Sequence, residues 1–192
     1  MEELKNLDSA VIREKKSYDL PVNWKFKPVL CIADILEREL FFVASETGPL
    51  PPNAARARAR SFTLYLVNRT GSETLVLKRK AGFFVNKMDV FDGPENFIGS
   101  IAKRKMPATD RFQILDTADE VLYDVEKDPH SEEVFRIMKN SAIVGKISRQ
   151  LTFKVEEGVS KRDHFGIVFP LDADVWKKSL LLGALLLIDC LY

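Results

Sequence analysis

The segment from Leu180 to Tyr192 contains 11 apolar side chains among 13 residues. A helix here is apolar on every face, so it has to be buried either in a large core or in lipid. The uninterrupted run from Leu180 to Ile188 has nine residues, and Asp189 follows it. Crossing the hydrocarbon of a bilayer takes roughly 20 apolar residues, and an ionisable side chain adds a cost. The run therefore predicts a buried helix, with a membrane anchor as the alternative.

Residues just before this run have the features of a helix N-terminus. Asp172 is expected to be the N-cap, and Asp174 falls in the first turn, where the helix dipole favours a carboxylate. We predict a helix over residues 172–190. The side chains expected to enter the core or the membrane are Leu180, Leu181, Leu182, Leu185, Leu186, Leu187 and Ile188.

The rest of the chain repeats one pattern, in which two short apolar strands flank a polar turn. Asp92, Asp116 and Asn140 lie at three such turns and are each 24 positions apart, and similar turns occur near Asp34 and Asn68. Asp and Asn favour turns because their side chains form hydrogen bonds with the nearby backbone. Successive hairpins at this spacing predict an antiparallel sheet of about ten to twelve strands, and a sheet of that size tends to close on itself.

These two features together predict a mainly β fold. We expect a closed antiparallel barrel with the C-terminal helix threaded through it. A chain of 192 residues is long enough to bury one substantial core, and no second domain is visible. We therefore predict a single domain over residues 1–192, with residues 1–9 as a flexible lead-in.

The overall charge balance conceals two segments of opposite sign. The chain has 29 Lys and Arg against 28 Asp and Glu, which excludes the basic field of a dedicated nucleic-acid binder. Residues 54–105 contain 11 basic and four acidic side chains, whereas residues 110–133 contain two basic and nine acidic ones. The basic segment is a candidate surface for anionic lipid headgroups, and solvated strand faces are the alternative. Its candidate residues are Arg56, Arg58, Arg60, Lys78, Arg79 and Lys80.

Catalytic motifs are not apparent in the sequence. The two histidines, His130 and His164, form no metal-binding pair, and no Gly-rich phosphate loop occurs. Cys31 and Cys190 are too few for a disulfide framework, and the first residues lack the apolar segment of a signal peptide. We expect an intracellular protein that is neither secreted nor an enzyme.

The segment from residue 164 to residue 175 reads His-Phe-Gly-Ile-Val-Phe-Pro-Leu-Asp-Ala-Asp-Val, and two lysines and the apolar run follow it. This ordered string resembles the C-terminal signature of the phospholipid scramblase family. Residues 40–47, 60–79 and 144–148 also resemble family segments, so the resemblance covers nearly the whole chain. It implies a tubby-like fold, in which a twelve-stranded antiparallel barrel surrounds a hydrophobic C-terminal helix. It also implies Ca2+-stimulated, ATP-independent movement of phospholipids between leaflets.

The resemblance further implies a calcium site in a loop of EF-hand size. With Gly166 at position six of that loop, Asp163 is at position three and Asp172 at position twelve, and Asp174 is a further candidate ligand. Calcium takes about six to eight oxygen ligands, but Lys161 brings a cation to position one. We expect a weak Ca2+ site at most. The alternative is that Asp172 only caps the helix and Asp163 is an ordinary loop charge.

Three functions are compatible with these observations. The first is phospholipid movement by a protein associated with an anionic membrane, at the cytoplasmic face of the plasma membrane and with an additional nuclear pool. The second is a non-transporting tubby-like module that binds anionic lipid headgroups or protein partners in signalling or transcriptional regulation. The third and weakest is a regulator that contacts nucleic acid, which the balanced net charge disfavours.

Overall fold

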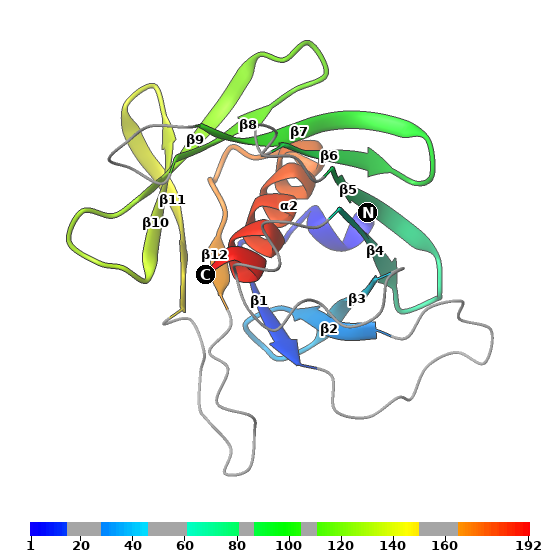
Figure 1. The fold of residues 1–192 in the computed structure, drawn as a ribbon. Coiled ribbons are helices and arrows are strands. Elements are labelled where there is room, and N and C mark those ends of the chain that lie inside the picture. Colours follow the sequence, from blue (N-terminus) through cyan, green and yellow to red (C-terminus); the bar gives the residue numbers. More distant parts are fainter. Residues whose placement is uncertain (15–27, 46–60, 81–86, 105–110, 150–164) are drawn as a thin grey trace.

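A computed structural model describes residues 1–14, 28–45, 61–80, 87–104, 111–149 and 165–192 of the protein. In this part of the chain, twelve antiparallel strands form a closed barrel around one long helix (Figure 1). Each strand pairs with its neighbours in the sequence, and β1 pairs with β12 to close the ring. The elements are η1 (Glu2–Leu4), β1 (Ser9–Glu14), β2 (Pro28–Ala33), β3 (Glu39–Ser45), β4 (Phe62–Asn68), β5 (Glu73–Arg79), β6 (Lys87–Asp92), β7 (Asn96–Arg104), β8 (Arg111–Leu115), β9 (Val121–Lys127), β10 (Val134–Lys139), β11 (Ala142–Ser148), β12 (Gly166–Val168) and α2 (Val175–Leu191). The predicted mainly β barrel is confirmed.

Three of the hairpin turns share one hydrogen-bond arrangement. They begin at Asp34, Asn68 and Asp116. In each turn the side-chain oxygen of this first residue accepts N–H bonds from the residues two and four positions later, at 2.8 to 3.1 Å. The residue three positions later has a positive φ, between 60° and 86°. Short polar side chains thus fix the turns, as the sequence pattern indicated.

Helix α2 lies inside the barrel, where Figure 1 shows it in orange and red with the strands around it. The seven apolar residues predicted for the helix interior, from Leu180 to Ile188, are at most 2% exposed. They form one hydrophobic cluster with inward-facing side chains of the strands, among them Leu77 and Ile101. The prediction of a buried helix is therefore confirmed. None of the helices in the described segments has the length and apolar content that a membrane crossing requires.

The helix begins later than the sequence indicated, so the assignment of Asp172 as N-cap is wrong. Asp174 is the N-cap, and its Oδ1 accepts a hydrogen bond from the backbone N–H of Lys177 at 2.9 Å. A turn closed by the N–H of Ala173 and the carbonyl of Pro170, 3.1 Å apart, precedes it. Asp172 lies within this turn because the chain has not yet entered the helix.

Replacing Asp174 by Ala is expected to lower the free energy of unfolding by about 1 kcal/mol, because a first-turn N–H loses its acceptor. Asp172→Ala is the matched control, since it removes only an exposed ion pair and is expected to cost less than about 0.5 kcal/mol. Urea titrations followed by circular dichroism measure both values. Equal losses for the two variants would contradict the assignment of Asp174 as the cap.

Residues 1–9, expected to be a flexible lead-in, instead pack against the barrel interior. Leu4 is fully buried and Leu7 nearly so, and both belong to the hydrophobic core. The Nζ atom of Lys178, in the first turns of α2, donates a hydrogen bond to the carbonyl of Lys5 at 3.2 Å. Leu4 and Leu7, three positions apart, hold this segment against the start of the helix.

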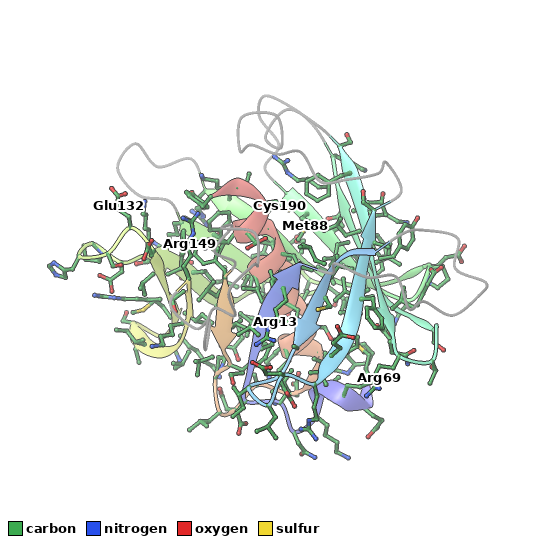
Figure 2. All side chains as sticks on the ribbon, turned by 90° about the horizontal axis from the view of Figure 1, so that it is seen from below. Arg13, Arg69, Met88, Glu132, Arg149 and Cys190 are labelled. Carbon is green, nitrogen blue, oxygen red and sulfur yellow. The ribbon has the colours of Figure 1, made fainter. Side chains whose placement is uncertain are left out.

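The barrel has two different ends. The short turns after β2, β4, β6, β8 and β10 lie at the same end as the start of α2, which we call the turn end. Tyr192, at the other end of the helix, lies beside Lys103 and Arg149 at the opposite end. Figure 2 shows this polarity, with Arg69 of the β4–β5 turn near the bottom and Arg149 and Cys190 in the upper half.

Candidate functional site

Two of the expected calcium ligands, Asp172 and Asp174, are paired with lysines. Oδ2 of Asp172 lies 2.5 Å from Nζ of Lys139, and Oδ2 of Asp174 lies 2.9 Å from Nζ of Lys177. The hydrogen bond from Lys139 lowers the pKa of Asp172. Partial burial opposes ionisation of Asp174, but hydrogen bonds from the backbone and side chain of Lys177 outweigh it and lower its pKa. Both carboxylates are thus ionised and already neutralised by the protein itself.

This arrangement does not fit a calcium ion. Within the described segments, no group of three or more His, Cys, Asp or Glu side chains is placed to hold a metal. Calcium needs several oxygen ligands at once, whereas Asp172 is engaged by Lys139 and Asp174 by the helix terminus. Asp163 and Lys161 lie outside the described residues. We therefore assign no mechanistic step to the ion.

Tyr123 lies next to this pair of aspartates, a neighbour that sequence reasoning did not identify. Its ring is almost fully buried, and Nζ of Lys139 lies 5.9 Å from the ring centre. Burial, together with the negative charges of Asp172 and Asp174, raises the pKa of Tyr123 to about 12. Pairing of β9 with β10 brings the tyrosine and the lysine together. Tyr123 and Lys139 are far apart in the sequence and become neighbours only through strand pairing, so no local sequence pattern predicts their contact.

The basic residues on β5 do not form one patch. Successive side chains of a strand point to opposite faces, so Lys78 is exposed whereas Arg79 is 4% exposed. The Arg79 guanidinium carbon lies 5.5 Å from the centre of the Phe62 ring, and Nζ of Lys78 lies 4.5 Å from that of Phe91. Among the described members of the predicted set, Lys78 and Lys80 are therefore the accessible ones. Arg56, Arg58 and Arg60 lie outside the described residues.

Sequence analysis also missed a set of exposed apolar side chains at the turn end. Their exposed fractions run from 46% for Trp176 to 99% for Leu171. We call this set the apolar tips: Ile35, Leu36, Val121, Ile143, Leu171 and Trp176. A single apolar residue in or beside a turn is a weak sequence signal. The set becomes visible only when the fold brings the turns to one end.

Comparison with known proteins identifies the family. The sequence model named Scramblase matches residues 1–192, the whole chain. The chain belongs to the scramblase family. This confirms the resemblance inferred from the C-terminal signature.

Curated scramblases are similar at modest identity. Phospholipid scramblase 1 of Mus musculus is 28% identical over 178 residues, which cover 84% of this chain and 53% of the relative. Phospholipid scramblase 2 of Bos taurus is 24% identical over an alignment of 219 residues, gaps included, that covers 100% of this chain and 70% of the relative. The chain thus spans about half the length of the scramblase 1 relative, at 53%.

A solved structure shares the fold. The X-ray structure of a protein from Arabidopsis thaliana superposes with a TM-score of 0.53, at 14% sequence identity. The match covers 93% of this chain and 91% of the plant protein. The likeness supports the barrel architecture alone.

Proposed function

We propose that this protein moves phospholipids between the two leaflets of a membrane, without ATP and with stimulation by Ca2+. The observation that carries the proposal is the scramblase family match over all 192 residues. Relatives named phospholipid scramblase align with most or all of the chain. The transported lipid stays chemically intact, so the task is to pass its polar headgroup across an apolar layer rather than to break a bond.

The packing of α2 restricts where lipid contacts this barrel. In the described part of the chain, the helix side chains from Leu180 to Ile188 fill the interior and are almost completely buried. A polar headgroup inside the barrel would lose its hydration, and the apolar side chains there offer no hydrogen bonds to compensate for that loss. We therefore propose that lipid contacts the outer surface or the ends of the barrel. The family resemblance supports the proposal that this contact occurs at the cytoplasmic face of the membrane. Calcium stimulation enters from the family resemblance, and no described residue is assigned as its ligand.

The burial of α2 also favours a second candidate, a non-transporting tubby-like module that binds anionic headgroups or protein partners. The apolar run that would otherwise enter a bilayer is already used as the core of the barrel. In this alternative, the exposed Lys78 and Lys80 are proposed to bind headgroup phosphates, together with Arg56, Arg58 and Arg60.

Reconstitution into vesicles separates the two candidates. Vesicles of phosphatidylcholine and phosphatidylserine carry a fluorescent lipid in both leaflets, and dithionite quenches only the lipid that reaches the outer leaflet. We expect quenching to continue past the outer-leaflet fraction without ATP, and to be faster with Ca2+ than with a chelator. Quenching that stops at the outer-leaflet fraction while the protein stays vesicle-bound would refute lipid movement and support the binding module.

A further inference from the structure

We infer that the turn end of the barrel docks on the phospholipid bilayer by inserting the apolar tips into its interface. This inference rests on the proposed action at a phospholipid membrane and names the face that meets it. It differs from the expectation drawn from the basic segment, because Lys78 and Lys80 follow β5 toward the opposite end of the barrel.

Exposed apolar surface is unevenly distributed over the barrel. All six large apolar side chains that are exposed in the described part of the chain lie at the turn end. Ile35 and Leu36 lie in the β2–β3 turn, and Val121 directly follows the β8–β9 turn. Leu171 lies between β12 and α2, and its side chain is 99% exposed. Single exposed apolar side chains are ordinary, but the concentration of all six at one end is uneven and favours an interaction surface there.

The apolar tips form one arc of the barrel rim. They belong to the turns and loops joined to β9, β11, β12 and β2, which follow one another around the ring with only β10 and β1 between them. Ile143, directly after the β10–β11 turn, is 59% exposed. The remaining two turns have polar sequences: Asn68 to Ser72 after β4, and Gly93 to Glu95 after β6. The ring thus has an apolar side and a polar side at the same end.

Contacts near the start of α2 tie part of this arc together. The ion pair between Asp172 and Lys139 joins the loop of Leu171 to the turn that precedes Ile143. Trp176 lies in the first turn of the same helix. Tryptophan is enriched where an apolar layer meets water, because its ring is apolar and its N–H is polar. Apolar side chains on separate turns suit a fluid bilayer, which needs none of the close shape complementarity of a protein interface.

Many of the carboxylates around the apolar tips are balanced by a cation, and Asp116 and Glu120 beside the β8–β9 turn add further negative charge. Five carboxylates of the arc are in ion pairs: Asp34–Arg38 at 2.6 Å, Glu37–Arg13 at 2.9 Å, Asp119–Lys87 at 3.1 Å, Asp172–Lys139 at 2.5 Å and Asp174–Lys177 at 2.9 Å. Attraction to anionic lipid depends on unpaired cations and weakens with salt. We therefore expect insertion to be driven by apolar area, to occur on zwitterionic lipid, and to depend little on salt.

The test uses the full chain and vesicles of phosphatidylcholine alone. The sequence has two tryptophans, so Trp24→Phe leaves Trp176 as the reporter of insertion. We expect a blue shift of its emission on vesicle addition, and co-sedimentation that persists at high salt. Replacing both Leu171 and Ile143 by Ser is expected to weaken vesicle partitioning by about tenfold or more, because two apolar side chains no longer leave water on insertion.

Two controls keep this result specific. Pro94→Ser changes an exposed residue of the polar β6–β7 turn. Lys78→Ser with Lys80→Ser removes the exposed lysines at the end of β5 and directly after it. Both are expected to leave partitioning onto phosphatidylcholine unchanged. Circular dichroism and the melting temperature of the Leu171/Ile143 variant are expected to match the parent, because both side chains are already exposed.

Three results would overturn the inference. The first is unchanged vesicle partitioning of the Leu171/Ile143 variant, and the second is binding that requires anionic lipid and is lost in the Lys78/Lys80 variant. The third is no vesicle binding by the parent, together with self-association of the parent that the Leu171/Ile143 variant loses. The last result would assign the arc to a second copy of the chain. If the Leu171/Ile143 variant exchanges lipid between leaflets as fast as the parent, the docking inference is refuted and the proposed function is not. If the parent binds vesicles through the apolar tips but exchanges no lipid, the docking inference is supported and the proposed function is refuted.

Discussion

Replacing Leu185 by Asp is expected to abolish the cooperative unfolding transition of the barrel. Leu185 lies in the middle of α2 and is fully buried in the hydrophobic cluster. A carboxylate there loses its hydration without gaining a partner, and the core loses an apolar side chain at the same time. The combined cost is expected to exceed about 4 kcal/mol, which is comparable to the lower end of the roughly 5–15 kcal/mol that stabilises a typical domain.

Leu171→Asp is the matched control for this change, because it makes the same substitution at a side chain that is 99% exposed. It is expected to alter the free energy of unfolding by less than about 0.5 kcal/mol. Urea titrations followed by near-ultraviolet circular dichroism report the tertiary packing of both variants. A Leu185→Asp protein that unfolds cooperatively with nearly the parental midpoint would show that α2 is not the core of the barrel.

Gly99→Ala is expected to lower the free energy of unfolding by about 3 kcal/mol or more. Gly99 on β7 has a φ of 144°, and a Cβ atom there would lie 2.3 Å from the backbone carbonyl oxygen of Leu115 on β8. Two methyl carbons of Leu180 on α2 would lie 3.0 and 3.2 Å away. The added methyl group therefore forces a backbone shift where two strands and the helix meet, besides the strain of a positive φ.

Gly93→Ala separates these two costs. Gly93 also has a positive φ, of 71°, but no atom lies within 4 Å of its added Cβ. This control is expected to cost about 1 kcal/mol from backbone strain alone. Thermal and urea unfolding give both values. If Gly99→Ala and Gly93→Ala lower the free energy of unfolding by similar amounts, β7 and β8 are not tightly packed at Gly99.

The hairpins and the buried helix were predictable because their signals are local. Asp34, Asn68 and Asp116 each fix a turn through their own side chains, within four residues of sequence. The apolar run of the helix was too short for a bilayer and too apolar for a surface, which left the barrel interior. In both cases, neighbouring residues and elementary geometry determined the outcome.

The functional residues were harder to predict because their surroundings come from distant strands. Asp172 was assigned to the helix cap and to calcium, but it pairs with Lys139, which lies 33 positions earlier in the chain. Arg79 was grouped with its exposed neighbours although strand alternation turns its side chain inward. The apolar tips were overlooked because each segment contributes only one or two of them, and they come together only when four separated segments meet at one end.

The closure of the ring has a consequence for how the protein is made. The pair that seals it joins Ser9 to Val168, and the helix that fills it ends at Leu191. On the ribosome, the strands from β1 to β11 emerge before the partner that seals the ring and before the helix that covers their apolar faces. The inner faces of the nascent strands therefore stay unprotected until β12 and α2 have emerged, which exposes the chain to aggregation during that interval.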